Sequence, residues 1–114
     1  MALQGTTREV QDVVIIDFSG KITLGEGSSL LRRTIKELID RGNRKILINL
    51  DDVDYIDSSG IGELVSAYTT VRSSSGELKL LNLTKRVHDL LQITRLFTVF
   101  DVQSDENVAV RSFR

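Results

Sequence analysis

Short runs of apolar, mostly β-branched residues alternate along this chain with longer segments in which apolar residues recur every three or four positions. Runs of the first kind are typical of strands buried on both faces, and segments of the second kind are typical of helices that pack one face on a core. Strands and helices that alternate over short connections indicate right-handed crossovers and a largely parallel sheet. We therefore predict an α/β fold whose central sheet is mixed but mostly parallel, with four or five strands and about four helices.

The strands are predicted from these apolar runs. Three of them follow directly from the sequence: residues 13–18 (VVIIDF), 45–50 (KILINL) and 77–83 (ELKLLNL). Residues 6–10 are expected to pair with the first of them as an antiparallel neighbour, and residues 98–102 are expected to add a last strand. The acidic stretch 51–57 is expected to lie beyond the second strand, where it leads into a helix.

The helices are predicted from apolar spacing and from residues that start or end a helix. The first begins at Ser28 and ends at Arg41-Gly42, a cation in the last turn followed by a glycine. The second begins near Ser58 and turns one set of apolar residues toward the core: Ile61, Leu64, Val65, Tyr68 and Val71. Thr84 caps a short third helix, and residues 104–106 begin a terminal one.

The composition limits the possible functions. The 114 residues fit a single domain, residues 1–114, and 15 Lys and Arg against 16 Asp and Glu leave a net charge of −1. This balance is unfavourable for a nucleic-acid or anionic-membrane binder, so we expect neither partner. The chain has no cysteine and one histidine, which excludes thiol chemistry, and we expect no metal and no cofactor. Because no apolar stretch is long enough to cross a membrane, we expect a cytoplasmic protein.

Binding sites of open α/β sheets lie beyond the carboxyl ends of the strands, where the following helices start. This rule selects three segments: residues 20–28, 51–62 and 82–85. The middle segment is the most unusual, because four aspartates precede two hydroxyls and two glycines at a predicted helix start. Ser58 is expected to cap that helix, where a phosphate is also tolerated. The alternative is that Ser58 or Ser59 is only a cap and that the aspartates only solvate a loop.

Three kinds of enzyme site resemble the same residues in part. The G-I-G at 60–62 resembles the start of a dinucleotide-binding fingerprint, but Val65 occupies the place of its third glycine. A nucleophilic serine needs a base, and the only histidine, His88, is expected on a helix flank. Asp57 is similar to a phosphoaccepting aspartate, but the acidic pair that such sites need after the first strand is replaced by Ser19-Gly20-Lys21. None of these three sites has all the residues that it needs, and a hydrolase that uses the aspartates to hold a metal stays open.

The run YIDSSGIG at residues 55–62 resembles the D-S-S/T-G-L/I-G signature of STAS domains, specifically bacterial anti-sigma factor antagonists. Further matches are Gly20 after the first strand, the KILINL strand, Gly76 before ELKLLNL, and LLQITRLFTVFDV near the end. The resemblance covers roughly residues 10–103, nearly the whole chain. It implies a single STAS-like domain that binds partners and has no catalysis of its own, so we expect no catalytic residues and no enzymatic activity.

The resemblance also implies a mechanism. In this family the unphosphorylated antagonist binds an anti-sigma factor that is also a serine kinase, and this binding frees the sigma factor. The kinase then phosphorylates the serine after the motif's aspartate, which is Ser58 here, with Ser59 as the alternative acceptor. Phosphorylation ends binding until a PP2C-type phosphatase removes the phosphate. We expect such a protein to be a monomer or a weak dimer.

The resemblance implies a partner-binding surface around the signature. Its residues are Thr23, Leu24, Gly25, Asp57, Ser58, Ser59, Gly60, Ile61 and Gly62. The two glycines of the signature either let the partner approach the backbone or pack the helix on the sheet, and Ile61 is either an apolar anchor or a core residue. The chain departs from the family where Lys21 and Thr23 replace two acidic residues. This change bears on which partner is bound.

Two other function classes stay open for the sequence. The chain is alternatively a STAS scaffold subunit of a larger signalling assembly, in which the serine controls assembly. A scaffold predicts a large particle in sedimentation, whereas an antagonist predicts a monomer or dimer. A small α/β hydrolase or nucleotide-binding enzyme predicts turnover or tight ligand binding by the isolated chain.

Overall fold

The computed structural model describes residues 2–113, and its strands form one sheet in the order β1-β2-β3-β4-β5. The strands are β1 (Gln4–Val10), β2 (Val13–Ile22), β3 (Lys45–Ile56), β4 (Glu77–Leu81) and β5 (Val102–Gln103). β1 pairs antiparallel with β2, and every other neighbouring pair is parallel. The predicted mixed, mostly parallel sheet and its antiparallel first strand are confirmed.

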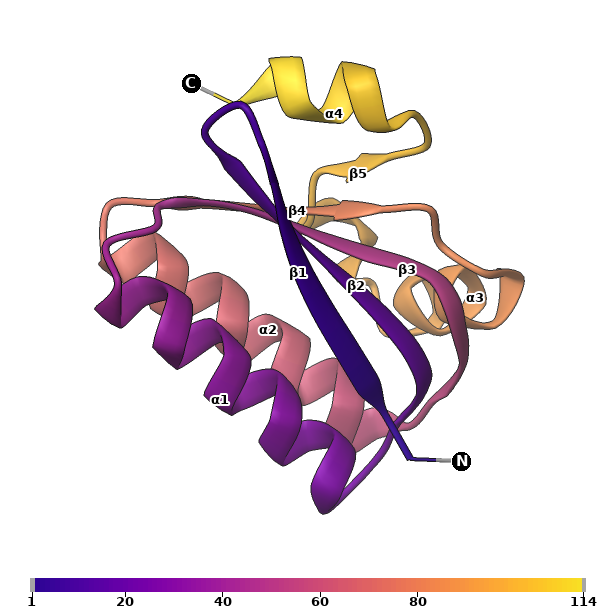
Figure 1. Cartoon of the computed structure of the whole chain (residues 1–114). Helices are drawn as coiled ribbons and strands as arrows, with labels where there is room; N and C mark the ends of the chain where they lie inside the picture. The colour runs from indigo at the N-terminus through magenta and orange to yellow at the C-terminus, as the bar shows by residue number, and fades with distance from the viewer. Residues whose placement is uncertain (1, 114) are drawn as a thin grey trace.

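Helices cover the two faces of the sheet unequally. They are α1 (Glu26–Asp40), α2 (Ser58–Ser73), α3 (Lys85–Ile93) and α4 (Glu106–Ser112), with a 3₁₀ turn at Leu96–Thr98. Figure 1 shows α1 and α2 side by side along one face and α4 on the other. Because the connections return each strand to the same edge of the sheet, the carboxyl ends of β2 and β3 lie together beside the starts of α1 and α2.

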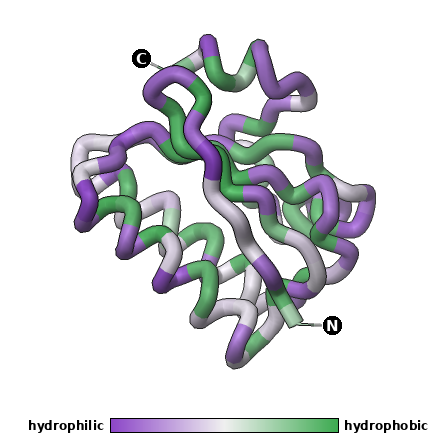
Figure 2. The backbone as a smooth tube through the Cα atoms, viewed as in Figure 1, coloured by the Kyte–Doolittle hydropathy of each residue, from purple (hydrophilic) through white to green (hydrophobic). Residues whose placement is uncertain are grey.

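The central strands are buried on both faces. Ile16 and Ile48 belong to the larger core, which α1, α2 and α3 cover, whereas Ile15 and Leu47 belong to a smaller core under α4. Alternate residues of a strand point to opposite faces, so continuous apolar runs are what such a position requires. In Figure 2 hydrophobic and hydrophilic residues alternate along the helices, which places one side of each helix against the sheet.

Two predicted boundaries are wrong. The acidic stretch 51–57 is not a loop: β3 continues through it to Ile56 and keeps pairing with β2, with Val53 and Ile56 buried between exposed aspartates. The last strand, predicted at 98–102, is only the two-residue β5, Val102–Gln103. Its apolar residues pack instead, since Phe100 is buried and meets the Tyr68 ring edge-on at 5.6 Å.

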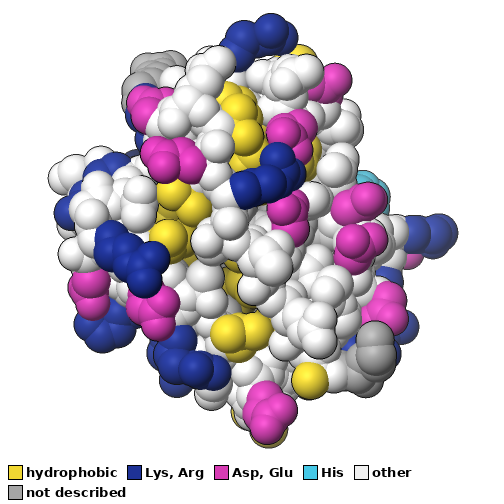
Figure 3. Space-filling view, in the orientation of Figure 1, with side chains coloured by type: hydrophobic (Ala, Val, Ile, Leu, Met, Phe, Trp, Pro, Cys, Tyr) yellow, Lys and Arg dark blue, Asp and Glu magenta, His cyan; other side chains and the backbone are white. Residues whose placement is uncertain are grey.

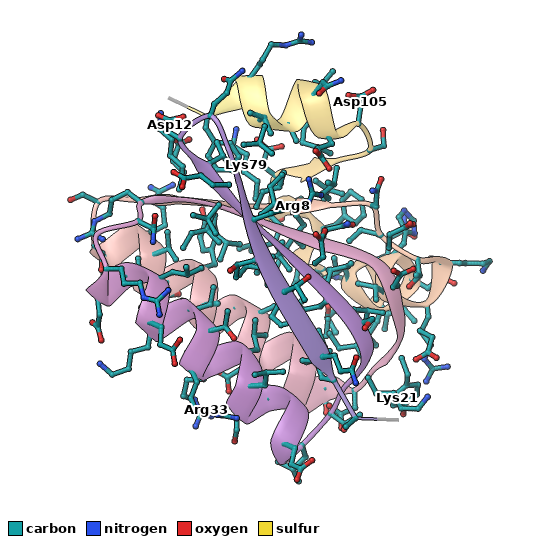
Figure 4. All side chains as sticks on the ribbon, in the orientation of Figure 1. Arg8, Asp12, Lys21, Arg33, Lys79 and Asp105 are labelled. Carbon is teal, nitrogen blue, oxygen red and sulfur yellow. The ribbon has the colours of Figure 1, made fainter. Side chains whose placement is uncertain are left out.

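Arg8 on the exposed strand β1 links several elements. Its guanidinium lies 2.6 Å from a carboxylate oxygen of Asp17 on β2 and 2.6 Å from one of Glu106 on α4. The Asn49 amide of β3 donates to the other oxygen of Asp17 at 2.8 Å. The hydrogen bonds from Arg8 lower the pKa of Asp17 and of Glu106. Arg8 is labelled in Figure 4, where it points across the sheet face toward α4.

Replacing Arg8 is expected to make stability less dependent on pH. The pKa of each partner carboxyl is lower in the folded state, so its stabilisation is present at neutral pH and is lost as pH falls from about 5. We expect Arg8→Ala to lower the free energy of unfolding by about 1 kcal/mol at pH 7, because exposed pairs contribute little each, and by much less at about pH 2.5. Urea unfolding at both pH values measures this.

Lys36→Ala, which removes an exposed pair with Asp40 inside α1, is the matched control and is expected to have a smaller effect. An equal loss of stability for Arg8→Ala at both pH values would contradict the assigned role.

Candidate functional site

Asp57 occupies the centre of the segment that the sequence singled out. It follows β3 in extended conformation and is the N-cap of α2, where its Oδ1 accepts from the backbone N–H of Gly60 at 2.8 Å. Its Oδ2 accepts from the N–H of Leu24 at 3.2 Å, in the loop between β2 and α1. One carboxylate therefore joins the start of α2 to the neighbouring loop.

The prediction that Ser58 caps this helix is wrong. Asp57 takes that role, because its extended backbone places a carboxylate next to the free N–H groups of the first turn. Ser58 is instead the first residue of α2, is exposed, and makes no side-chain hydrogen bond within residues 2–113. Ser59 is half-buried. The structure thus leaves the Ser58 hydroxyl available to solvent.

The glycines of the signature differ in their surroundings. A Cβ on Gly60 would lie 2.2 Å from the carbonyl oxygen of Ile22 and 2.6 Å from the Ile56 side chain. The start of α2 therefore packs against the backbone of β2 too closely for any side chain at this position. A Cβ on Gly62 would meet nothing within 4 Å. Ile61 is 4% exposed and belongs to the larger core, as the core alternative predicts.

The loop between β2 and α1 presents an apolar side chain beside Ser58. Leu24 is 78% exposed, although its backbone N–H is held by Asp57. The loop is also held from the other side, because Ser28 donates to the Thr23 carbonyl from its N–H at 3.0 Å and from its hydroxyl at 2.9 Å. Ser28 therefore does not begin α1, which starts two residues earlier after Gly25 without a side-chain cap. Leu24 sits on a fixed backbone.

A groove of about 580 Å³ lies on the other side of Ser58, between the end of β3 and α3. It is lined by Tyr55, Ile56, Asp57, Ser58, Lys85, Arg86, Asp89, Leu90 and Ile93. The Arg86 guanidinium lies 4.2 Å from the centroid of the Tyr55 ring, and Ile93 is 78% exposed. The sequence selected residues 51–62, which include Tyr55, and residues 82–85, but it gave no signal for Arg86 or Ile93, because their proximity to Tyr55 depends on where α3 docks.

The remaining candidates are the histidine and the acidic side chains. His88 meets the Phe97 ring edge-on at 5.0 Å on α3, as expected for a flank histidine. Within residues 2–113 no group of three or more His, Asp or Glu could hold a metal ion. None of the helices in this part of the chain is both long and apolar enough to span a bilayer. On the face shown in Figure 3, acidic and basic side chains lie interspersed.

Comparison with known proteins agrees with this geometry. The STAS domain family model matches residues 5–109, which is most of the chain. This chain belongs to the STAS domain family of anti-sigma factor antagonists. An anti-sigma-B factor antagonist of Bacillus subtilis is 28% identical over 111 residues, covering 97% of this chain and all of that protein. The family resemblance of the sequence is confirmed, and antagonists of this family are regulatory proteins without catalytic activity.

Solved structures show the same fold. A candidate anti-sigma factor antagonist from Thermotoga maritima superposes with a TM-score of 0.87 at 26% identity, covering 96% of this chain and 94% of that one. SpoIIAA of Bacillus in its phosphorylated form superposes with a TM-score of 0.73 at 20% identity, covering 95% and 97%. At that identity the second match shows the STAS fold alone.

The two signature glycines are expected to respond oppositely to a methyl group. Gly60→Ala would press a Cβ against the backbone of β2, so we expect it to lower the free energy of unfolding by about 2 to 3 kcal/mol. Gly62→Ala meets open space inside a helix and is expected to raise it by about 0.5 to 1 kcal/mol. Urea unfolding of the two variants measures both effects, and equal changes would contradict the close contact between α2 and β2.

Proposed function

We propose that this chain is a phosphorylatable antagonist in a partner-switching pathway. Its unphosphorylated form binds an anti-sigma factor that is also a serine kinase, and phosphorylation of Ser58 ends that binding. A PP2C-type phosphatase restores the binding form. The observation that carries the proposal is the exposed, unbonded Ser58 hydroxyl at the first position of α2, on a backbone that Asp57 fixes. The existence of a phosphorylated form of SpoIIAA, a protein with the same fold, supports it.

The surroundings favour Ser58 over Ser59 as the acceptor. A kinase must reach the hydroxyl, and Ser58 is exposed whereas Ser59 is half-buried. A phosphate in the first turn of α2 gains about 0.3 to 1 kcal/mol from the helix dipole. The nearby exposed aspartates oppose it only weakly, because water screens them. The phosphate therefore leaves the fold of the antagonist intact.

The switch acts at the interface with the partner. A phosphate carries about −1.5 to −2 charges at pH 7, and burying such a charge without a partner costs several kcal/mol. Since about 1.4 kcal/mol is a tenfold change in affinity, this cost is enough to end binding. The added charge need not change the antagonist's shape.

The exposed members of the signature region form the docking surface. Leu24, Gly25, Ser58 and Gly62 reach solvent, whereas Gly60 and Ile61 support them from the interior. Lys21, at a position where the family resemblance implies an acidic residue, lies 3.5 Å from Asp54. We assign the choice of partner to this exchange of charge.

Variants of the two serines test the switch. Ser58→Ala is expected to keep binding the anti-sigma factor kinase, because it removes only an exposed hydroxyl. Ser58→Asp is expected to weaken binding by about tenfold or more, because it places a charge in the interface. Ser59→Ala is the matched control and should bind and be phosphorylated like the wild type. A pull-down with phosphopeptide fragmentation gives both readouts, and equal capture of the two Ser58 variants would refute the proposal.

The exposed leucine of the loop tests the docking surface. Leu24→Ala is expected to weaken binding by about fivefold to thirtyfold, since a buried leucine side chain contributes about 1 to 2 kcal/mol more than alanine. Stability should not change, because Leu24 is exposed in the free chain. Val108→Ala, at an exposed position on α4, is the control. Calorimetric titration measures both, and equal affinities would place the interface elsewhere.

A further inference from the structure

Arg86 is a cation without a carboxylate partner at the edge of the proposed phosphorylation site. Within residues 2–113 no carboxylate pairs with it, and its guanidinium lies 4.2 Å from the centroid of the Tyr55 ring. Arg86 and Ser58 line the same groove of about 580 Å³. The neighbouring Lys85, in contrast, is already paired with Asp89 at 2.8 Å. An exposed guanidinium with no carboxylate partner therefore lines the same groove as the serine.

The backbone that carries Arg86 is fixed relative to Ser58. The Thr84 hydroxyl donates to the Val53 carbonyl of β3 at 3.1 Å and accepts from the Val87 N–H at 3.4 Å, and Val87 is fully buried. The first turn of α3 is thus attached to the strand that leads into Ser58. Only the Arg86 side chain therefore has to move for its guanidinium to leave the Tyr55 ring and reach a group on Ser58.

We infer that Arg86 binds the phosphate of phosphorylated Ser58, a phosphate monoester dianion. On phosphorylation the guanidinium leaves the face of Tyr55 and pairs with the phosphate across the groove. A guanidinium presents two parallel N–H groups that match two phosphate oxygens, which makes this pair stronger than the exposed cation–π contact that it replaces. The inference rests on the proposed function, because that function supplies the phosphate.

The other charged groups at the groove are already paired or hydrogen-bonded. Within the lining, Asp57 is held by two backbone N–H groups and Lys85 is paired with Asp89. Lys21, which is outside the lining, lies 5.4 Å from the centroid of the Tyr55 ring and is paired with Asp54 at 3.5 Å. A new dianion therefore meets one uncompensated cation in this groove. Phosphorylation then changes two features of the docking surface at once, because it adds the phosphate and withdraws Arg86 from the partner.

A phosphorus NMR titration tests this pairing on the full chain. Phosphoserine is encoded at position 58 during synthesis, so no kinase or partner is needed. A paired cation favours the dianion, so Arg86→Gln is expected to move the midpoint of the phosphate titration upward by about half a pH unit or more. Arg33→Gln changes an exposed arginine on α1, outside the groove, and should leave the midpoint unchanged (Figure 4).

The outcomes separate this inference from the proposed function. A midpoint for Arg86→Gln equal to that of the phosphorylated wild type overturns the inference. Arg86→Lys keeps the charge without the two-pronged geometry and is expected to give an intermediate midpoint. Circular dichroism checks that the variants are folded, which is expected because Arg86 is exposed. If the midpoint rises but Ser58→Ala and Ser58→Asp bind the partner equally, the switch fails and the phosphate pairing stands.

Discussion

The carboxylate of Asp57 holds together two segments that meet only in the folded chain. Its two oxygens accept from the N–H groups of Gly60 and Leu24, and Leu24 lies 33 residues away along the sequence. Each hydrogen bond to a charged group contributes about 1.5 to 3 kcal/mol, a substantial fraction of the roughly 5 to 15 kcal/mol that typically separate folded from unfolded states. Because Asp57 caps α2, the serine that follows it has no structural task. The accessible hydroxyl is a consequence of the cap.

Close backbone contact at the end of β2 completes this frame. A Cβ on Gly27 would lie 2.7 Å from the Lys21 carbonyl, and one on Gly60 would lie 2.2 Å from the Ile22 carbonyl. The starts of α1 and α2 are therefore pressed against successive carbonyls of one strand. Such contact leaves no room for relaxation, so the residues around Ser58 divide into buried ones that fix the backbone and exposed ones that a partner can touch.

The fold is predictable from the sequence because, over most of the chain, the spacing of apolar residues matches the pattern of burial in the structure. Continuous apolar runs such as 13–16 occur where both faces of a strand are covered, and the helices follow from their spacing. The sequence does not predict the extension of β3, because Asp51, Asp52 and Asp54 are exposed there. A run of charged residues at the end of a strand resembles a loop in sequence. The sequence does not distinguish Asp57 from Ser58 as the cap, because aspartate and serine are equally good caps and only the backbone angles decide between neighbours. The groove was missed because Tyr55 and Arg86 meet only after α3 docks.

The tight packing behind Ser58 limits how a modification of this residue can affect the protein. Ser58 lies on the outside of a turn whose inner contacts, through Gly60 and Ile61, are already tight. A packed core of this kind transmits a change only if it has a second arrangement of similar free energy, and nothing in these contacts provides one. The phosphate that we propose on Ser58 therefore acts through what it places on the surface: its own charge and the side chains that it attracts. On the proposed function, the specificity of the response therefore belongs to the exposed residues around the serine, while the buried signature residues set the position of the hydroxyl.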